Sequence, residues 1–432
     1  MIAIASGATC AGAMITSPDS TFDAIIAGAR VAGSAVAIAL ARRGLKVLLI
    51  DKAAFPSDTL STHIVLAGGA KVLARMNALE HLERAGARRY ESMRMLGPGY
   101  DYSVDLARED EDLRGFCFGR MPMDAAMLAL ARDSGAVVRE RFRLTGLVIE
   151  DGAVAGVRGE DQSGAHEFRA ALVVGADGMR STVAKLAEAK LGAFVRTEVP
   201  CARAYYYSYY EDVSRKRFGD DLVTELDAGP GQGAILCRCE NGRVVAAVAF
   251  DAARMHSFRT DLEGNLKREL ERSFVVGSLI EGGRASGKIY SSGILLNTYR
   301  KPITDGALLV GDAGLHVDPL FGQGHSLALM TAEIVGELAP GWFSARDGRV
   351  IGAAAMSEFA SRRDRLLMPY YSSSVRTSGG LRHDPTTHAA HLVAQRETWA
   401  AREMARFGQM ASSGGFPSFR FARMLARQAR AA

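Results

Sequence analysis

The sequence predicts a two-lobed α/β protein with a parallel sheet, an antiparallel second lobe and a helical end. Three observations lead to this fold class. A strand, a glycine-rich loop, a helix and a second strand follow one another within residues 23–51. Another glycine-rich stretch follows an apolar strand within residues 307–324. Alternating and aromatic strands occupy residues 196–296, a pattern typical of an antiparallel sheet.

The composition indicates an ordinary globular protein. The 432 residues are 48% hydrophobic and 23% charged, and a net charge of +5 is too mild to indicate nucleic-acid binding. The five cysteines are few and mostly isolated, which favours a reducing, cytoplasmic setting. We interpret Cys237 and Cys239 as core or pocket residues rather than as a redox pair, and we expect no metal site. Apolar runs stay shorter than the roughly 20 residues of a membrane span.

Four parts are expected along the chain. Residues 1–22 carry no Lys or Arg, so we interpret them as a disordered extension rather than a secretory signal, with Met14 as an alternative start. The nucleotide-binding domain is predicted to be discontinuous, because its apolar strands recur late in the chain. The remaining boundaries are 23–195 with 297–350 for that domain, 196–296 for the antiparallel substrate lobe, and 351–432 for the helical C-terminal segment.

The first strand–loop–helix–strand unit predicts a dinucleotide site. Continuous apolar strands at Ala24–Ala27 and Lys46–Ile50 indicate a Rossmann-like parallel sheet covered on both faces. The loop between them opens an alanine-rich helix, so its backbone amides and the helix dipole favour a pyrophosphate. Asp51 ends the second strand, where its carboxylate can accept hydrogen bonds from ribose hydroxyls. The loop residues expected at the cofactor are Gly28, Ala29, Arg30, Val31, Ala32 and Gly33.

Arg30 departs from the usual glycine pattern. The middle position of G-x-G-x-x-G normally carries glycine, because the backbone there approaches the phosphates closely. A side chain at position 30 limits that approach, yet its guanidinium can itself contact phosphate or adenine. A coincidental glycine turn is the alternative, and the complete order of strand, loop, helix, strand and acid favours dinucleotide binding.

The second glycine-rich stretch indicates one long ligand that is held at both ends. Asp312 follows the strand Ala307–Val310 and therefore projects from a strand end into the crevice. The irregular segment Asp318–Gly324 then leads into a helix at His325–Leu338, whose first amides would face an electron-rich ring. FAD is the ligand that fits two such loops. A structural turn with an acid at a strand end is the alternative.

Together these motifs resemble the flavoprotein monooxygenase superfamily, which includes para-hydroxybenzoate hydroxylase, geranylgeranyl reductases and FAD-dependent halogenases. The resemblance covers residues 23–338. It rests on the first loop with Asp51, on Arg120–Asp124, on Gly175–Ser181 and on Gly311–Gly324.

The resemblance implies the roles of further residues. Arg120 would contact FAD, Asp177 would lie beside it, and the backbone near Leu144 would face adenine. The segment Pro319–Gly324 would face the flavin ring. The cofactor residues expected beyond the first loop are Asp51, Lys52, Thr62, His63, Arg120, Leu144, Asp177, Asp312, Gly322, Gln323, Gly324 and His325.

Candidates for chemistry and substrate binding are few. His63 lies where members of the superfamily wrap the flavin from the side, and it is the candidate catalytic acid or base. A structural histidine is the alternative. Tyr205, Tyr207 and Tyr209 fall on one face of a predicted strand, where they would line a substrate pocket or simply pack in the sheet.

The expected function is FAD-dependent monooxygenation of a hydrophobic or aromatic small metabolite with O2. NAD(P)H would act as a transient reductant, or a partner flavin reductase would supply reduced flavin, because the chain has no second glycine pattern for a resident nicotinamide. The alternatives are a C=C reductase of the geranylgeranyl reductase type, a halogenase, and a non-catalytic binding protein. A halogenase is disfavoured, because the catalytic lysine of the FAD-dependent halogenases follows directly after the first βαβ unit. This chain has no lysine between Lys52 and Lys71.

Overall fold

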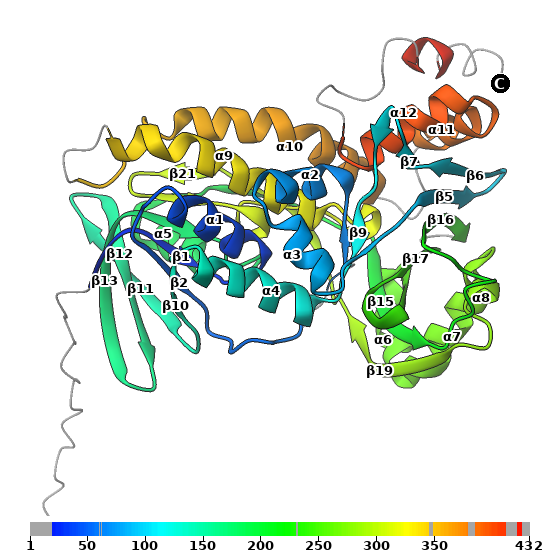
Figure 1. The fold of residues 1–432 in the computed structure, drawn as a ribbon, viewed down its shortest axis with the longest axis horizontal. Helices are drawn as coiled ribbons and strands as arrows, with labels where there is room; N and C mark the ends of the chain where they lie inside the picture. The colour runs from blue at the N-terminus through cyan, green and yellow to red at the C-terminus, as the bar shows by residue number, and fades with distance from the viewer. Residues whose placement is uncertain are drawn as a thin grey trace, which may run out of the picture.

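A computed structural model shows two lobes joined by short strands, with helices along one side of the larger lobe (Figure 1). It describes residues 20–59, 61, 63–229, 232–344, 349–378, 385–411 and 421–425. Within these ranges, no helix is long and apolar enough to cross a membrane. The same ranges contain no group of three or more His, Cys, Asp or Glu side chains placed to hold a metal ion.

The larger lobe is built on a sheet that combines a parallel core with an antiparallel meander. Its strands are β1 (Thr21–Ala27), β2 (Val47–Ile50), β10 (Val137–Arg139), β11 (Arg143–Glu150), β12 (Ala153–Asp161), β13 (Gly164–Gly175), β21 (Ile303–Thr304) and β22 (Ala307–Leu309). The parallel pairs are β1 with β2, β2 with β10, β1 with β13, and β13 with β22. Because β22 comes from late in the chain, this sheet is discontinuous in sequence, as expected.

Side chains of the parallel strands alternate between two cores. Ala24 and Ile26 face one core, whereas Ile25 and Ala27 face the other. The first core is covered by α1 (Val31–Ala41), α4 (Arg120–Asp133) and α9 (Gly324–Ser344), and the second by α5 (Thr182–Leu191). The two covered faces explain why these strands read as continuous apolar runs.

The second lobe is an antiparallel sheet with one parallel pair. In spatial order its strands are β19 (Arg284–Ser291), β15 (Arg203–Glu211), β18 (Val244–Asp251), β17 (Gln232–Arg238), β16 (Asp221–Gly229), β5 (Ser92–Gly97) and β6 (Tyr100–Asp105). Its outer face is covered by α6 (Met255–Phe258), α7 (Leu262–Arg272) and α8 (Val276–Leu279). Strands β5 and β6 lie within the range that sequence analysis assigned to the nucleotide-binding domain. The parallel pairing of β5 with β16 joins residues far apart in sequence, so no local pattern indicates it.

The N-terminal boundary also differs from expectation. Residues 1–19 lie outside the described ranges, but Thr21 and Phe22 belong to β1 rather than to an extension. Phe22 is buried, and its ring lies 6.0 Å from that of Phe168 on β13. Because these residues pack against a neighbouring strand, the folded part of the chain begins before residue 23.

The remaining short elements belong to neither large sheet. They are β3 (Ile64–Val65), α2 (Ala67–Arg75), α3 (Leu79–Arg84), β4 (Arg88–Arg89), β7 (Ala107–Arg108), β8 (Glu111–Asp112), β9 (Phe116–Cys117), β14 (Arg196–Pro200), β20 (Leu296–Arg300) and β23 (Leu315–His316). Strand β14 pairs with β20 and not with the seven-stranded sheet of the second lobe, although sequence analysis placed residue 196 at the start of that lobe.

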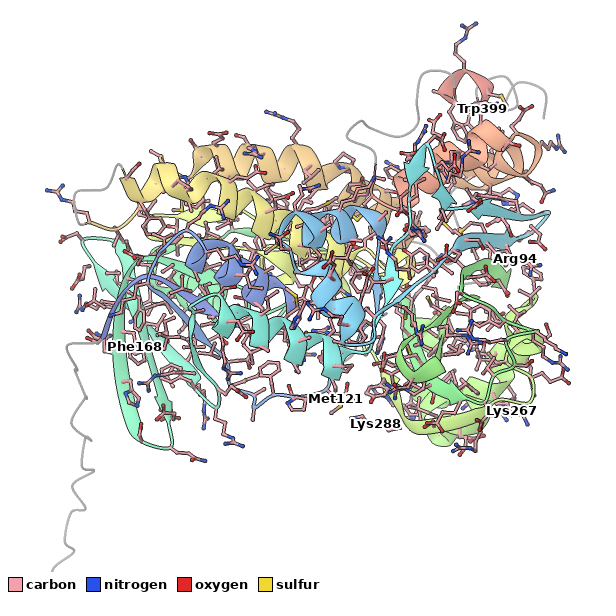
Figure 2. All side chains as sticks on the ribbon, in the orientation of Figure 1. Arg94, Met121, Phe168, Lys267, Lys288 and Trp399 are labelled. Carbon is pink, nitrogen blue, oxygen red and sulfur yellow. The ribbon has the colours of Figure 1, made fainter. Side chains whose placement is uncertain are left out.

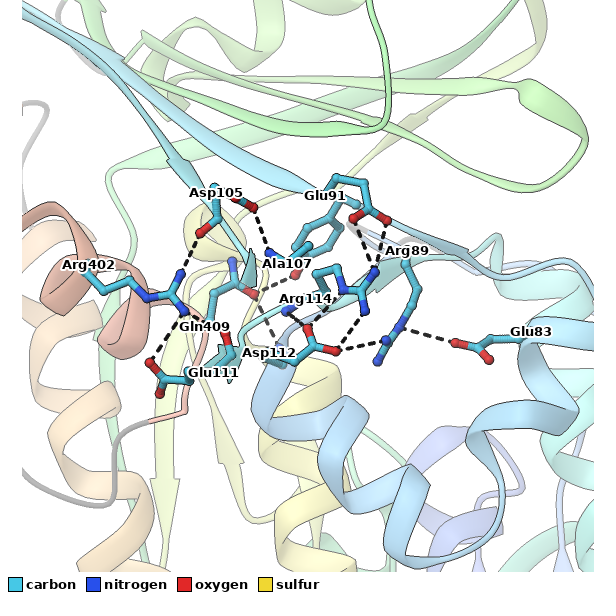
Figure 3. Close-up of polar contacts among 12 residues, drawn as sticks. Glu83, Arg89, Glu91, Asp105, Ala107, Glu111, Asp112, Arg114, Arg402 and Gln409 are labelled. Atoms are coloured by element: carbon cyan, nitrogen blue, oxygen red, sulfur yellow. Dashed lines mark hydrogen bonds and ion pairs between the residues drawn. The ribbon is translucent and has the colours of Figure 1, made fainter. Parts of the chain in front are cut away.

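The C-terminal segment is helical, as predicted. Its described helices are α10 (Ser357–Ser378), α11 (Pro385–Arg396) and α12 (Thr398–Gly408). Trp399, at the start of α12, lies in these helices at the end of the molecule away from β1 and β13 (Figure 2). The segment is fastened to β6 and β8 by Arg402, which donates to the backbone oxygens of Asp105 and Glu111 (Figure 3).

Gln409, just beyond α12, is the buried part of this fastening. Its Oε1 accepts hydrogen bonds from the Tyr90 hydroxyl at 2.6 Å and from the Ala67 amide at 3.3 Å. Its backbone oxygen accepts from the Gly68 amide at 2.9 Å. The C-terminal segment therefore holds the first turn of α2, which follows directly after His63 and β3.

Candidate FAD and substrate site

One cavity of about 570 Å³ runs from the carboxyl ends of β1 and β2 to the inner face of the second sheet. This volume is within the range of small-molecule sites. Both glycine-rich stretches line the cavity, the first through Gly28 and Ala32 and the second through Asp312 and Gly324. A Cβ built on Gly311 would lie 3.0 Å from the Ala32 Cβ. Two segments that are remote in sequence therefore meet at one site.

The first loop needs glycine at both of its ends. Gly28 has φ +103°, and a Cβ there would come within 2.4 Å of the Ala176 backbone oxygen. A Cβ on Gly33 would lie 1.7 Å from the Gly28 oxygen. The loop is thus packed tightly against β13, and α1 begins without a side-chain cap. Its first-turn amides are left for a ligand in the cavity.

Asp51 is held at the end of β2 by the loop itself. Its Oδ2 accepts from the Ala29 amide at 2.7 Å, and its Oδ1 accepts from the Ala53 amide at 2.8 Å. Each carboxylate oxygen keeps a further lone pair, and the side chain lines the cavity. This arrangement fits a carboxylate that accepts from ribose hydroxyls.

Arg30 points its guanidinium toward protein groups as well as the cavity. It donates to the Ser57 backbone oxygen at 3.2 Å, to the Ser57 Oγ at 3.0 Å and to the Asp58 oxygen at 3.2 Å, and it pairs with Asp124. The side chain is 27% exposed and lines the cavity. Its donors are therefore largely used to fix the segment after β2, in addition to any contact with phosphate or adenine that sequence analysis expected.

Asp124 was missed as a site residue. Its side chain is fully buried and forms ion pairs with both Arg30 and Arg120. The Arg120 Nη2 lies 3.0 Å from the Asp124 Oδ2. The four-residue spacing of Arg120 and Asp124 places both on one face of α4, a signal that was present in the sequence. Asp124 positions two arginines of the cavity wall without lining it.

Asp177 lines the cavity, but its carboxylate is mainly bound to the start of α5. It accepts from the Ser181 hydroxyl, from the Thr182 amide at 2.6 Å and from the Val183 amide at 3.2 Å. Burial raises the pKa of Asp177, and these donors oppose that shift. The residue fixes the wall beside Gly28 by capping a helix.

Some residues of the second glycine-rich stretch line the cavity, and others lie behind its wall. Asp312, Gly324 and His325 line the cavity, whereas Gly322 and Gln323 lie behind it. Gly322 has φ +64°, and a Cβ there would be 3.3 Å from the Ile64 Cβ. Gln323 is buried at the start of α9. Both residues place the wall rather than form it.

His63 and His325 are neighbours; the His63 ring is fully buried, whereas His325 is partly buried and lines the cavity. His325 contacts the Ile64 oxygen through Nδ1 at 3.1 Å and the Ser61 Oγ through Nε2 at 3.3 Å. Burial, followed by the nearby Arg120 charge, lowers the pKa of His63 to about 4 and that of His325 to about 3. His63 has φ +66° and bonds the Tyr209 hydroxyl through Nε2.

The three candidate tyrosines share one face of β15, as predicted. Tyr205, Tyr207 and Tyr209 belong to the core on the inner side of the second sheet, and Tyr206 belongs to the outer one. Tyr205 and Tyr207 line the cavity. Tyr209 lies behind Tyr207, with ring centroids 6.1 Å apart.

Most of the described cofactor candidates therefore reach the cavity. Those on its wall are Gly28, Arg30, Val31, Ala32, Asp51, Lys52, Arg120, Leu144, Asp177, Asp312, Gly324 and His325. Those behind the wall are Ala29, Gly33, His63, Gly322 and Gln323. Thr62 lies outside the described residues.

Comparison with known protein families identifies most of the chain. The model of a family described as FAD binding domain matches residues 21–337. The chain belongs to this FAD binding domain family. It is a FAD-dependent oxidoreductase by family, and the glycine loops, the uncapped start of α1 and Asp51 fit the long nucleotide cofactor of that family.

Relatives of this flavoprotein include named enzymes. Digeranylgeranylglycerophospholipid reductase 2 of Methanothermobacter thermautotrophicus is 29% identical over 322 residues, which cover 74% of this chain and 77% of that protein. The corresponding reductase of Methanosarcina mazei is 27% identical over 331 residues, 76% of this chain and 78% of the relative.

A solved structure confirms the fold. The flavoprotein/dehydrogenase from Cytophaga hutchinsonii aligns with a TM-score of 0.76 at 15% identity, over 90% of this chain and 92% of that chain.

Proposed function

We propose that this flavoprotein reduces carbon–carbon double bonds in a hydrophobic isoprenoid substrate. Sequence analysis favoured monooxygenation and kept this reductase as its first alternative. The relatives support the reductase instead, because those at 26–29% identity bear the name digeranylgeranylglycerophospholipid reductase. Each of them aligns over about three quarters of its own length.

One observation carries the proposal from the family to this chain. The part of the cavity wall that comes from β15, β17 and β18 has no charged side chain among its described residues. Those residues are Tyr205, Tyr207, Gly233, Ala234, Ile235, Ala247, Val248 and Ala249. An aliphatic chain loses water favourably against such a wall, at roughly 25 cal/mol per Å² of apolar surface.

The charged groups gather on the opposite side of the cavity. Arg30, Asp51 and Arg120 come from the larger lobe, beside the glycine loops. The cavity is therefore polar where a dinucleotide would lie and apolar where a substrate would lie. Such a division fits an isoprenoid substrate better than a polar metabolite.

FAD, when bound, would supply hydride chemistry, and NAD(P)H or a partner reductase would renew its electrons. The protein residues have separate tasks. The α1 amides, Asp51 and Asp312 would hold the cofactor, and Asp124 would orient Arg30 and Arg120. The apolar wall would exclude water and place the substrate double bond.

The test is anaerobic turnover of FAD-loaded protein with dithionite as reductant. Geranylgeranyl diphosphate and detergent-dispersed digeranylgeranylglycerophospholipid are the probes, and mass spectrometry follows the addition of hydrogen to double bonds. Free FAD with dithionite is the control. Saturated product without oxygen supports the proposal. Oxygenated products that form only with O2 support the monooxygenase and overturn the reductase. The absence of product both with and without O2 also overturns the reductase.

A further inference from the structure

A single carboxylate oxygen joins two sides of the cavity at its apolar end. On one side is Tyr205 of β15, which lines the cavity from the second sheet. On the other side are Pro319 and Leu320, which line it from the second glycine-rich stretch. The Oδ1 atom of Asp318 accepts a hydrogen bond from the Tyr205 hydroxyl and, at 2.9 Å, another from the Leu320 amide. Asp318 itself is buried and lies behind the wall.

The segment after Asp318 approaches the second sheet at another point as well. A Cβ built on Gly233 of β17 would lie 3.5 Å from the Leu320 Cδ1. In the register of the sheet, Gly233 lies opposite Ala249, and Ala249 lies opposite Tyr205. The segment therefore crosses a row of cavity-lining residues that runs from Tyr205 to Gly233. The space between the segment and this row is narrow, so its width depends on how the segment is held.

The backbone of Asp318 is fixed by buried polar side chains. Its amide donates to the Asn297 Oδ1 at 2.8 Å and to the Ser374 Oγ at 3.1 Å. The Ser374 hydroxyl also donates to the Asn297 Oδ1, at 2.9 Å. Asn297 belongs to β20 and Ser374 to α10, and both are buried. The carboxylate thus projects from a rigid base, which is what accurate placement of its partners requires.

Both donors to the Asp318 carboxylate keep their protons. Burial, followed by the nearby Asp318 charge, raises the pKa of Tyr205 well above its ordinary value, so its hydroxyl remains a donor. The Leu320 amide does not titrate, and its hydrogen bond caps the turn Pro319–Phe321. Hydrogen bonds to an ionised acceptor are stronger than those between neutral groups. The contact between the two sides is therefore maintained near neutral pH.

We propose that Asp318 is a positioning residue that sets the width of the substrate space between the Pro319–Leu320 wall and the second sheet. The inference rests on the proposed reductase function. Asp318 acts through Tyr205 and Leu320 and does not touch the substrate. An isoprenoid chain that lies between the two walls is held at one depth, which keeps its double bond aligned for reduction.

The test compares three variants with a matched control. Asp318→Ala removes the shared acceptor, and Tyr205→Phe removes only the donor from the sheet. Asp318→Asn keeps a side-chain oxygen that can accept from both donors. The control is Asp251→Ala, because Asp251 also accepts from the amide two residues later, that of Ala253, but lies away from the cavity wall.

The readouts separate substrate binding from turnover. Binding of the saturated analogue phytanyl diphosphate is followed by flavin absorbance, and kcat and KM by anaerobic reduction of geranylgeranyl diphosphate with dithionite. Asp318→Ala and Tyr205→Phe should bind FAD as the wild type does. Their kcat/KM should fall by about 10- to 100-fold, mostly through a higher KM, because the walls contact the substrate before reaction. Phytanyl diphosphate should bind more weakly to the same extent.

Two further comparisons test the hydrogen bonds themselves. Asp318→Asn and Asp251→Ala should keep the wild-type KM. The double variant of Asp318→Ala and Tyr205→Phe should have the KM of Asp318→Ala alone, because residues that act through one contact are not additive. If Asp318→Ala does not fold, Tyr205→Phe and Asp318→Asn decide the question.

Failure of the inference and failure of the function give different results. If Tyr205→Phe keeps the wild-type KM and affinity for phytanyl diphosphate, Asp318 does not set the width, although the reductase function stands. The inference also fails if Asp318→Asn is as impaired as Asp318→Ala, if the two effects add, or if Tyr205→Phe loses FAD. If the wild type reduces neither isoprenoid probe, both proposals are overturned.

Discussion

Gly311 lies against Ala32, so the two glycine-rich stretches of this flavoprotein touch each other at the cofactor cavity. The contact is close, since a Cβ on Gly311 would be 3.0 Å from the Ala32 Cβ. Gly311 also has φ +54°, a backbone conformation that favours glycine.

Gly311→Val should therefore weaken FAD binding. A β-branched side chain at this φ is strained, and it would push the second stretch away from α1. FAD affinity is measured by flavin fluorescence, and stability by thermal unfolding. Gly44→Val is the control, because Gly44 has φ +78° with nothing within 4 Å of its added Cβ. Equal FAD affinity in the two variants would contradict the shared site.

Replacement of Asp124 should destabilise the cavity wall. Asp124→Ala leaves Arg30 and Arg120 without their shared carboxylate, and loss of one partner of a buried ion pair costs about 3–5 kcal/mol. Urea unfolding should show this loss, together with weaker FAD binding. Asp110→Ala removes an exposed partner of Arg108 and should leave both properties unchanged. Wild-type stability in Asp124→Ala would contradict the role assigned to Asp124.

Stability should fall as the pH is lowered through the range in which unfolded histidines take up protons. The pKa of His325 is about 3 in the folded protein and 6.5 by its ordinary value. Between these values the unfolded chain binds more protons than the folded one, so acid favours unfolding. The stabilising effect of the neutral ring is complete above 6.5 and is lost toward 3. His325→Gln should reduce the slope of Tm against pH between 6.5 and 4, and an unchanged slope would contradict a neutral His325 ring.

Gln409→Ala should loosen the C-terminal fastening. It removes the acceptor of the Ala67 amide and the nearer acceptor of the Tyr90 hydroxyl, which keeps only the Val65 oxygen at 3.5 Å, at a cost of about 1–3 kcal/mol. Hydrogen exchange should increase at the first turn of α2. Gln162→Ala is the control, because the Gln162 side chain is exposed between β12 and β13, and no such increase is expected there. If exchange in α2 is the same in both variants, the C-terminal segment does not stabilise that turn.

Local signals were sufficient for the parts of the fold that are continuous in sequence. The strand–loop–helix–strand unit within residues 23–51 could be predicted, because apolar runs and glycine mark its ends. The alternation of Tyr205 to Tyr210 was equally readable. Pairing of β5 with β16 could not be predicted, since it depends on tertiary contacts between distant segments.

The same distinction applies to the site. Gly28 and Asp51 carry a pattern that a nucleotide loop requires, and both lie on the cavity wall. The engagement of His63 with Tyr209 depends on how two lobes meet, so sequence alone left His63 as a candidate acid or base. Gly322 and Gln323 belong to a recognisable motif, but the turn places them behind the wall.

Asp58 touches both lobes at once. Its backbone oxygen accepts from Arg30 of the first loop, and its carboxylate accepts from the Tyr290 hydroxyl at the edge of the second sheet. A single residue thus spans the seam between the FAD-binding lobe and the lobe of the second sheet. Any hinge motion that widens this seam has to separate Asp58 from one of its two neighbours, so the opening of the cavity and the position of the glycine loop are mechanically linked.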